Sequence, residues 1–309
     1  MPNQKRKIKR SRYILLLITL VLAAVIYLLA DRYLIEHVEG NGVLATESNV
    51  ATIEVAGNVV TDDWNYKSDN ATISIKKVQT GSGKDLVTYF VADVQLSDSS
   101  SLKSAFAKNE YGRNIVEKTS EIASENKAIF AINGDYYGFR SDGVLIRNGI
   151  LYRDEPARTA AALFKNGTLQ TFDETEVNSS SLLAEGALQT LSFGPVLIKN
   201  GEVVDDFGKV AVDTNFGNRS IQGSNPRTGI GMISPNHFVF VVVDGRMENY
   251  SKGMTLPQFA DVFAKLGCTE AYNLDGGGSS TMYFNGRVVN NPLGKQEERA
   301  ISDILYIKG

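Results

Sequence analysis

Three aspartates that could take part in catalysis each lie at the end of an apolar run, next to a glycine. They are Asp135 in AINGDYY, Asp244 in VVVDGR and Asp275 in YNLDGGGSS. A strand that ends beside a glycine turn places its next side chain at the rim of a sheet, where functional sites form. Any one of the three could instead be a turn aspartate that bonds its own backbone. Three similar arrangements in one domain favour a shared site.

The run that follows Asp275 could bind an anion. Consecutive glycines allow backbone N–H groups to converge on a negatively charged ligand, and neighbouring serines could add hydroxyl donors. The residues concerned are Gly276, Gly277, Gly278, Ser279 and Ser280. The alternative is a flexible turn. A Walker phosphate-binding loop is excluded because no Gly-Lys-Ser/Thr follows, and the glycine spacing does not fit a dinucleotide-binding fingerprint.

Two arginines are candidates for holding a phosphate. Arg158 in PARTAA and Arg227 in NPRTGIG are each followed by a threonine, which in the second case is Thr228. Guanidinium is the preferred bidentate partner of phosphate. Most single arginines are solvated surface charges, so the remaining candidates are weaker: Arg147, Arg246 and Arg299.

The sequence has too few histidines and cysteines for several common mechanisms. Its only histidines are His37 and His237, and its only cysteine is Cys268. This composition argues against Ser-His-Asp or Cys-His catalysis and against a zinc site. We expect no cofactor and no metal, although an oxygen-ligated Ca²⁺ or Mg²⁺ would be compatible with the carboxylates. Catalysis would then depend on carboxylates, arginines, amides and backbone donors.

Basic residues are concentrated at the N-terminus. Residues 1–12 contain six Lys or Arg and no acid, which leaves 26 basic against 35 acidic residues in the rest of the chain. The acidic remainder argues against a nucleic-acid partner. An uncharged apolar run follows at 13–30, long enough to cross a hydrocarbon core of about 30 Å. The positive-inside rule predicts a cytoplasmic tail at 1–12, a single-pass anchor in the lipid bilayer at 13–30, and an extracytoplasmic remainder.

A cleaved signal peptide is the alternative interpretation of this segment. The apolar run is long for a signal peptide, and Leu29-Ala30-Asp31-Arg32 is a poor cleavage site. One cysteine permits no internal disulfide, which fits a bacterial, in particular a Gram-positive, cell-surface protein.

Strand patterns dominate the chain after a stalk or linker that we expect at residues 31–69. Alternating or continuous apolar runs predict strands at 71–78, 87–96, 128–132, 237–243, 270–274 and 300–307. Four Asn-Gly pairs between apolar runs each predict a type I′ hairpin, at 148–149, 166–167, 200–201 and 285–286. Residues 100–124 are polar and compatible with a helix.

The clearest helix of the exported part follows Thr255. Thr255 and Gln258 form a capping-box pattern, and Gly267 is a stop signal. This helix connects two apolar strands, so we expect an α+β fold with a strand-rich mixed central sheet and a few helices.

Seven stretches of the chain, in this order, resemble the phosphodiester glycosidase family. They lie between residues 128 and 307 and read AINGDYYGF, ARTAAALF, FGPVLIKNG, NPRTGIG, VVVDGR, GMTLPQFADVFAKLGCTEAYNLDGGGSSTM and ERAISDIL. The long stretch that ends in NLDGGGSS is the most specific. The family includes the enzyme that uncovers mannose 6-phosphate by removing an α-linked N-acetylglucosamine, and many bacterial members are associated with exopolysaccharide. The resemblance implies a phosphodiester glycosidase domain at residues 70–309.

The resemblance implies a hydrolase that cuts the C1–O bond of a sugar-1-phosphodiester. The leaving phosphate would need charge stabilisation, which Arg227, Arg158 and the glycine run could supply. One carboxylate would act as nucleophile or as base for water, and a second would stabilise an oxocarbenium-like transition state. The expected carboxylates are Asp275 and Asp135, with Asp244 third; Asn133 and Asn273 would hold sugar hydroxyls or orient carboxylates, and Tyr136 and Tyr137 would stack on the sugar.

Two other functions are compatible with the same residues. One is a transferase or processing factor in the assembly of wall polymer or exopolysaccharide, with a sugar acceptor in place of water. The other is a non-catalytic glycan-binding module tethered to the membrane.

Overall fold

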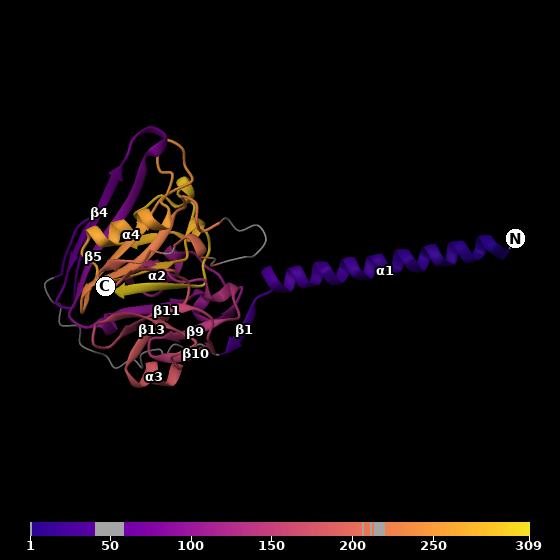
Figure 1. The fold of residues 1–309 in the computed structure, drawn as a ribbon, viewed down its shortest axis with the longest axis horizontal. Coiled ribbons are helices and arrows are strands. Elements are labelled where there is room, and N and C mark those ends of the chain that lie inside the picture. Colours follow the sequence, from indigo (N-terminus) through magenta and orange to yellow (C-terminus); the bar gives the residue numbers. More distant parts are fainter. Residues whose placement is uncertain (1, 41–58, 206, 211, 213–219) are drawn as a thin grey trace.

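The computed structural model describes residues 2–40, 59–205, 207–210, 212 and 220–309. Within these ranges the chain forms four α-helices and five β-sheets (Figure 1). The helices are α1 (Pro2–Tyr33), α2 (Thr119–Glu125), α3 (Ser179–Ala184) and α4 (Leu256–Lys265). The predicted α+β, strand-rich fold class is confirmed.

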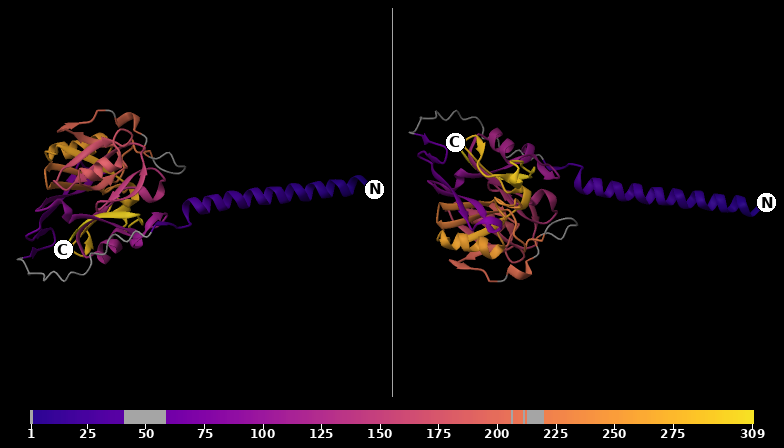
Figure 2. Two further views of the ribbon diagram at one scale, coloured as in Figure 1. Left: turned by 90° about the horizontal axis from the view of Figure 1, so that it is seen from below. Right: turned by 90° about the horizontal axis from the view of Figure 1, so that it is seen from above.

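Helix α1 projects away from the folded body and carries the N-terminus at its far end (Figures 1 and 2). Its segment Tyr13–Arg32 is long and apolar enough to cross a membrane, and none of it is buried inside the protein. This segment includes the apolar run predicted at 13–30. An apolar surface of this length that is not covered by protein is compatible with a membrane anchor or with a signal sequence.

The largest sheet contains nine strands and forms the centre of the folded body. Its strand order is β15 (Glu202–Val203), β14 (Val196–Lys199), β18 (Glu270–Leu274), β16 (Arg227–Ser234), β17 (His237–Val243), β5 (Val87–Leu96), β4 (Ala71–Thr80), β3 (Asn65–Lys67) and β2 (Val60–Thr61). Helix α4 joins β17 to β18, which run in the same direction. Strand β16 lies between them and pairs antiparallel with both. Each of the other described ladders of this sheet is antiparallel as well.

A five-stranded sheet packs against one face of the nine-stranded sheet. Its order is β20 (Arg287–Val288), β19 (Met282–Phe284), β8 (Ala128–Asn133), β21 (Asp303–Lys308) and β6 (Leu102–Phe106). The smaller sheets are β12 (Leu169–Asp173), β11 (Thr159–Phe164) and β13 (Ala187–Leu191); β9 (Gly143–Arg147) and β10 (Ile150–Glu155); and β1 (His37–Gly40) and β7 (Tyr111–Arg113).

Side-chain alternation on β17 shows how these layers are held together. Phe238 and Phe240 point into the main core, which they share with residues of the five-stranded sheet such as Phe130. Val239 and Val241 point to the opposite face, where α4 covers them. The strand is therefore buried on both faces, as its continuous apolar run predicts. Helix α2 covers the outer face of the five-stranded sheet, which gives the body the layers α4, sheet, sheet and α2.

The structure departs from the expected elements in two segments. Residues 100–124, expected to be compatible with a helix, form β6 and β7 before the short helix α2. Ser104 in β6 is buried and bonds Gln189 at 2.9 Å, so a polar residue fits inside a sheet because a distant side chain satisfies it. In the predicted stalk, β1 pairs with β7 and β3 pairs with β4. Sheet pairing therefore begins before residue 70, while residues 41–58 of the predicted stalk lie outside the described residues.

All four Asn-Gly pairs connect antiparallel strands, but only three form the predicted turn. Both turn residues have positive φ at 148–149, 200–201 and 285–286, as a type I′ turn requires. At the fourth pair only Gly167 has positive φ, at 82°. There the Asn166 side chain accepts a hydrogen bond from the Thr168 amide at 3.0 Å, which stabilises a different turn.

Close contact between α4 and β16 depends on glycine. A Cβ placed on Gly231 would lie 2.7 Å from Cδ1 of Phe263 and 2.7 Å from Sγ of Cys268. We expect Gly231→Val to lower the free energy of unfolding by about 1–3 kcal/mol because the helix must move away. Gly208→Val is the matched control, since a Cβ on Gly208 meets nothing within 4 Å. Denaturant unfolding followed by circular dichroism measures both, and equal losses would contradict this account of the packing.

Candidate active site

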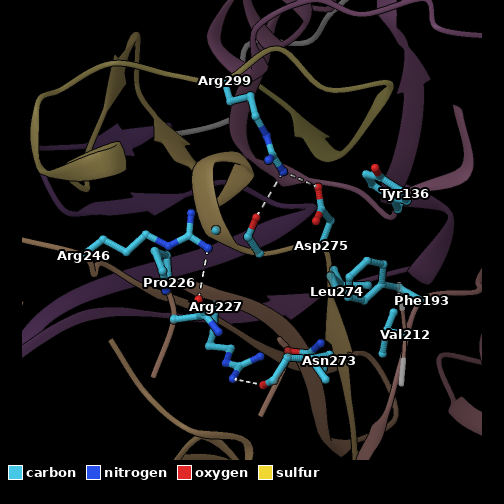
Figure 3. A pocket seen from close by; sticks show the side chains of 14 residues that line it. Tyr136, Phe193, Val212, Pro226, Arg227, Arg246, Asn273, Leu274, Asp275 and Arg299 are labelled. Atoms are coloured by element: carbon cyan, nitrogen blue, oxygen red, sulfur yellow. Dashed lines mark hydrogen bonds and ion pairs between the residues drawn. The ribbon is translucent and has the colours of Figure 1, made fainter. Parts of the chain in front are cut away.

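Three neighbouring strands meet at one edge of the nine-stranded sheet. Arg227 begins β16 opposite Val243 of β17, and Thr228 lies opposite Leu274, the last residue of β18. A cavity of about 110 Å³ opens at this edge (Figure 3). Its polar lining consists of Asn225, Arg227, Arg246, Asn273, Asp275 and Arg299, and its other walls include Tyr136, Phe193, Val212, Pro226, Gly276 and Gly277. We call this space the edge cavity.

Asp275 is the carboxylate that lines the edge cavity. Its side chain is 12% exposed, and none of the other lining residues is an Asp or Glu. Its Oδ2 accepts a hydrogen bond from Ser279 Oγ at 2.5 Å and lies 3.2 Å from Nη2 of Arg299. Arg299 also donates to Ser279 Oγ at 2.6 Å. The three side chains form one hydrogen-bonded unit in the cavity wall.

The surroundings of Asp275 have opposing effects on its acidity. Burial raises the pKa of Asp275 by disfavouring the charged carboxylate, whereas Arg299 and the Ser279 hydroxyl act to lower it. The effect of burial is the larger, so the pKa lies above the ordinary value for aspartate. A carboxylate of this kind is a strong base for its type, which suits work at a reacting carbon.

The glycine run makes room for two arginines. Gly277 has a φ of +65°, and a Cβ there would lie 3.0 Å from Nη2 of Arg246. A Cβ on Gly278 would lie 3.2 Å from Cδ of Arg299. Larger residues would therefore push both guanidinium groups away from the cavity.

The backbone amides of this loop differ from the predicted anion nest. The Gly277 amide donates to the Pro226 carbonyl at 3.0 Å, and the amides of Ser279 and Ser280 donate to the carbonyls of Gly276 and Gly277. These three donors are used inside the protein. The positive charge at the cavity comes from arginine side chains instead.

Arg227 lies in the cavity wall among neutral partners. In the described residues its guanidinium donates to the carbonyl oxygens of Met254 at 3.0 Å, Ile221 at 2.6 Å and Gly223 at 2.8 Å. Burial, followed by the nearby charge of Arg246, lowers the pKa of Arg227 to about 10. A buried cation that bonds only carbonyls beside a second cation would be stabilised by an anion in the cavity.

The opposite wall of the cavity suits a sugar. Tyr136 and Phe193 lie there with ring centroids 6.2 Å apart (Figure 3). Asn273 donates to the Gly194 carbonyl at 2.8 Å, but its buried Oδ1 has no hydrogen-bond partner among the described residues. A ligand hydroxyl could satisfy that oxygen.

Asn133 and Thr228 position the Asp275 loop and do not line the cavity. Asn133 Nδ2 donates to the backbone carbonyl of Asp275 at 2.8 Å. Its Oδ1 accepts from Thr228 Oγ1 at 2.8 Å and from the Thr281 amide at 3.2 Å. Both side chains are fully buried.

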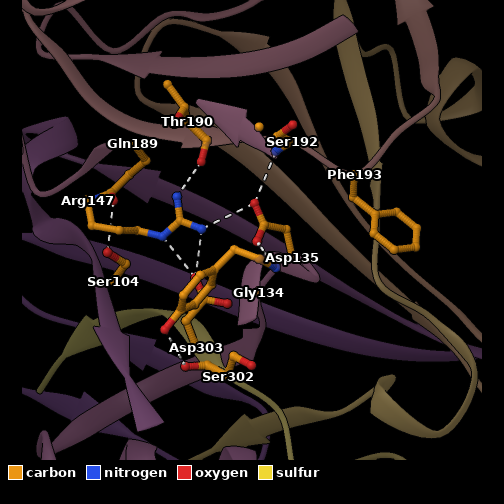
Figure 4. A network of polar contacts seen from close by, with 12 residues as sticks. Ser104, Gly134, Asp135, Arg147, Gln189, Thr190, Ser192, Phe193, Ser302 and Asp303 are labelled. Atoms are coloured by element: carbon orange, nitrogen blue, oxygen red, sulfur yellow. Dashed lines mark hydrogen bonds and ion pairs between the residues drawn. The ribbon is translucent and has the colours of Figure 1, made fainter. Parts of the chain in front are cut away.

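Asp135 lies behind the cavity in a buried ion cluster (Figure 4). Arg147 Nη2 lies 3.2 Å from Asp135 Oδ2 and 2.8 Å from Asp303 Oδ2, and the three side chains are at most 1% exposed. Asp135 also accepts from the amides of Tyr137 and Ser192, each at 3.0 Å. The structure therefore places this predicted catalytic carboxylate in a buried ion pair and outside the cavity lining.

The two carboxylates of this cluster differ in acidity. Burial acts to raise the pKa of Asp135, but Arg147 and the two amides outweigh it and hold the pKa below its usual value. Burial raises the pKa of Asp303 to about 7, with Arg147 opposing and Asp135 adding to the rise. Asp135 is thus the carboxylate of the pair that stays ionised beside Arg147.

Asp244, the third predicted carboxylate, organises a loop. It is 1% exposed and accepts from Tyr250 Oη at 2.7 Å, from Asn290 Nδ2 at 2.8 Å and from the Asn291 amide at 3.0 Å. These donors use both carboxylate oxygens, and Asp244 is not part of the cavity lining.

Two further predicted residues lie away from the edge cavity. Arg158 pairs with Asp142 at 2.5 Å and donates to Ser192 Oγ at 2.8 Å, and it lines a different cavity. Tyr137 is 2% exposed, and its ring packs 5.3 Å from that of Phe106. The predicted pair of phosphate-binding arginines is therefore separated.

Several lining residues are weak or absent among the sequence candidates. Arg246 and Arg299 are weaker candidates than Arg158 by sequence, and Phe193 and Asn225 are not among the candidates, although they begin the stretches FGPVLIKNG and NPRTGIG. Asn225 accepts from Arg246 at 3.0 Å, and it lies only two positions before Arg227 in NPRTGIG. Its place as the first residue of that stretch is the signal that could have indicated it.

The described ranges contain no group of three or more His, Cys, Asp or Glu side chains that could hold a metal ion. The expectation that the site needs no metal or cofactor stays a prediction.

The buried cluster yields a stability prediction. We expect Arg147→Met to lower the free energy of unfolding by about 3–5 kcal/mol, because it leaves two buried carboxylates without their cation. Lys252→Met removes the exposed ion pair with Asp85 and should leave stability nearly unchanged. Thermal unfolding of both variants measures the difference. A small effect of Arg147→Met would show that the cluster does not hold the fold together.

The chain matches known proteins at the level of sequence. The family model described as phosphodiester glycosidase matches residues 126–308. The SPbeta prophage-derived uncharacterized protein YomE of Bacillus subtilis is 29% identical over 84% of this chain and 41% of its own length. The N-acetylglucosamine-1-phosphodiester alpha-N-acetylglucosaminidase of Bos taurus is 32% identical over 41% of this chain and 25% of its own length. The chain thus spans less than half the length of either relative.

Two solved structures share the fold. The catalytic domain of the zebrafish N-acetylglucosamine-1-phosphodiester alpha-N-acetylglucosaminidase, auto-inhibited by its pro-peptide, superposes with a TM-score of 0.58 at 21% identity, covering 79% of this chain and 85% of that domain. A hypothetical protein from Synechocystis gives a TM-score of 0.56 at 15% identity, covering 82% of this chain and 64% of its own. Because the family model matches more than half of the chain, including every residue that lines the edge cavity, the chain belongs to the phosphodiester glycosidase family.

Proposed function

We propose that this protein is a membrane-anchored, extracytoplasmic glycosidase that hydrolyses the C1–O bond of a sugar-1-phosphodiester in a cell-surface glycan or glycoconjugate. The observation that carries the proposal is the edge cavity, where Asp275 faces inward beside Arg227, Arg246 and Arg299. The reaction needs a carboxylate at the sugar and positive charge at the phosphate, and this cavity offers both. Family membership supports the same reaction class.

Asp275 is the group that acts at the anomeric carbon. In its ionised form it either attacks C1 or takes a proton from the attacking water, and the stereochemistry of the released sugar distinguishes these two routes. Arg299 and Ser279 fix the orientation of the carboxylate. Held in this way, Asp275 needs little reorganisation during the reaction.

Arginines on the cavity wall stabilise the leaving phosphate. A phosphate monoester leaves as an anion, so it does not need full protonation by a second carboxylic acid. Arg227 is largely buried and bonds only carbonyl oxygens among the described residues, and Arg246 lies beside it. The substrate phosphate supplies the anion that these two cations favour. Because arginines stabilise the leaving phosphate, the reaction needs one carboxylate in the cavity lining rather than two.

The aromatic wall and Asn273 bind the sugar. Tyr136 and Phe193 provide apolar ring surfaces for the C–H face of a pyranose. The buried Oδ1 of Asn273 accepts a sugar hydroxyl or amide N–H. The α1 segment Tyr13–Arg32 anchors the catalytic body to the bilayer, with the N-terminal basic residues on the cytoplasmic side.

A transferase would use the same cavity with a sugar hydroxyl in place of water. Whether water or a sugar acceptor receives the transferred sugar decides between these reactions. Product analysis with and without an acceptor glycan distinguishes them. A glycan-binding module would bind the same ligands without turnover. The raised pKa of Asp275 in a cavity that is also lined by arginines favours catalysis over binding without turnover.

The direct test is release of free sugar by the purified full chain from a panel of sugar-1-phosphodiesters. We expect Asp275→Asn to reduce turnover by roughly 10²–10⁴-fold, because the neutral amide can neither attack C1 nor accept a proton. Asp93→Asn is the matched control, since Asp93 pairs with His237 at the far end of β17 and should keep full activity. Turnover that survives in Asp275→Asn, or that is absent from the folded wild type, would refute the proposal.

The surroundings of Asp275 predict a shift in pH dependence. Activity that needs ionised Asp275 is lost as pH falls through its pKa, which burial already places above the usual value. Arg299→Gln removes the cation that opposes this rise, so the acid limb of the kcat/KM profile should move to higher pH. Arg299→Lys keeps the charge and should move it less. An acid limb that stays in place or moves to lower pH in Arg299→Gln would contradict the role of the pair.

A further inference from the structure

A second cavity lies where α1 meets the folded body. It encloses about 580 Å³ and is lined on one side by Leu28, Asp31 and Arg32 at the end of α1. The opposite side comes from the loop after β8 and from strands of the body, including Arg113 and Arg140. We call it the junction cavity. The junction cavity is distinct from the edge cavity, because most of the residues that line it do not line the edge cavity.

The lining of the junction cavity contains more arginines than carboxylates. Its lining contains four arginines and two aspartates: Arg32, Arg113, Arg140 and Arg158 against Asp31 and Asp142. Arg158 is about four-fifths buried, and its carboxylate partner Asp142 is half exposed. Arginines that converge on one space favour an anion, and phosphate is the anion that matches the guanidinium geometry best.

The position of the cavity along α1 gives its depth in a bilayer that the segment Tyr13–Arg32 would cross. The segment Tyr13–Arg32 has 20 residues, which as a helix extend over about 30 Å, the thickness of a hydrocarbon core. Arg32 then lies at the level of the lipid headgroups, and Leu28 lies one turn deeper. A cavity lined by both residues opens at headgroup depth.

Hydrogen bonds and an ion pair hold the segment from the end of α1 through β1 against the body. Asn114 Nδ2 donates to the backbone carbonyls of Asp31 at 3.2 Å and Ile35 at 2.9 Å. Arg113 pairs with Glu39 at 2.6 Å across the β1–β7 ladder. The cavity is therefore part of a fixed junction between helix and body.

From these observations we infer that the junction cavity binds the phosphate headgroup of an anionic membrane lipid. The inference rests on the membrane anchoring in the proposed function. The lipid phosphate lies among the arginines while its acyl chains extend along Leu28 into the bilayer. Binding of one lipid fixes the catalytic body at a defined tilt above the membrane.

Arg140 lies between the junction cavity and the edge cavity. Arg140 lines the junction cavity, and its guanidinium lies 5.3 Å from the ring centroid of Tyr136 and 5.1 Å from that of Phe193. Both rings line the edge cavity. Arg140 therefore contacts both the junction cavity and the aromatic wall of the edge cavity.

Lipid retention by the full chain tests the inference. The protein is purified in a neutral detergent, and binding of phosphatidylglycerol and of phosphatidylcholine with the same acyl chains is measured by native mass spectrometry. We expect one phosphatidylglycerol to be retained in preference to phosphatidylcholine. The double variant Arg32→Gln/Arg113→Gln should weaken phosphatidylglycerol binding by roughly tenfold or more, because it removes two of the four cations.

A matched control is available at the same junction. Lys108 pairs with Glu36 at 2.6 Å but does not line the cavity, so Lys108→Gln should retain phosphatidylglycerol as the wild type does. Equal retention of the two lipids, or unchanged retention in the double variant, would overturn the inference. Stronger binding of a soluble glycerol-phosphate oligomer than of phosphatidylglycerol, lost in the double variant, would assign the cavity to a phosphorylated glycan and overturn it as well.

Hydrolysis of a soluble sugar-1-phosphodiester in the same preparations separates this inference from the proposed function. Asp275→Asn should lose hydrolysis and keep the lipid, whereas Arg32→Gln/Arg113→Gln should lose the lipid and keep hydrolysis in detergent. Retained hydrolysis also shows that the double variant is folded. Lipid selectivity without any hydrolysis by the wild type would refute the proposed function alone.

Discussion

The carboxamide of Asn133 joins the two main sheets at the point on which the candidate site depends. Asn133 ends β8 of the five-stranded sheet, and its oxygen accepts from Thr228, which belongs to β16 of the nine-stranded sheet. Its nitrogen donates to the backbone of Asp275. One buried side chain therefore links both sheets to the loop after β18. The Asn133 bonds act together with the β16–β18 ladder and with the hydrogen bond from the Gly277 amide to the Pro226 carbonyl, which also hold Asp275 near the start of the Arg227 strand.

Charge is divided between two centres on either side of this joint. Arg147 lies between two carboxylates inside the protein, and that cluster is closed to solvent. At the edge cavity, Asp275 faces several arginines, and Arg227 bonds only carbonyl oxygens among the described residues. A cluster of paired charges closed to solvent belongs to the fold. Several cations around one carboxylate leave positive charge that an anionic ligand would balance. The candidate function follows from the second centre.

Local sequence signals predicted the elements that depend on local physics, and they failed where distant residues decide. The apolar run of β17 and the capping box of α4 contain the information that forms them. Strand β6 does not, because its buried Ser104 is satisfied by Gln189 far along the chain. Likewise Asp135 and Asp275 follow similar apolar runs, and only the partner of each distinguishes them. Arg147 pairs with the first and Arg299 lines a cavity with the second, and no spacing rule indicates either pairing.

The central claim is that this chain breaks the bond between the anomeric carbon and oxygen. Hydrolysis of a sugar-1-phosphodiester in water enriched in ¹⁸O, followed by mass spectrometry of both products, measures where the water oxygen goes. The account predicts the label in the released sugar and none in the phosphate monoester, because Asp275 directs attack to C1 while the arginines hold the departing phosphate. Label in the phosphate would show attack at phosphorus and would contradict the proposed role of the edge cavity.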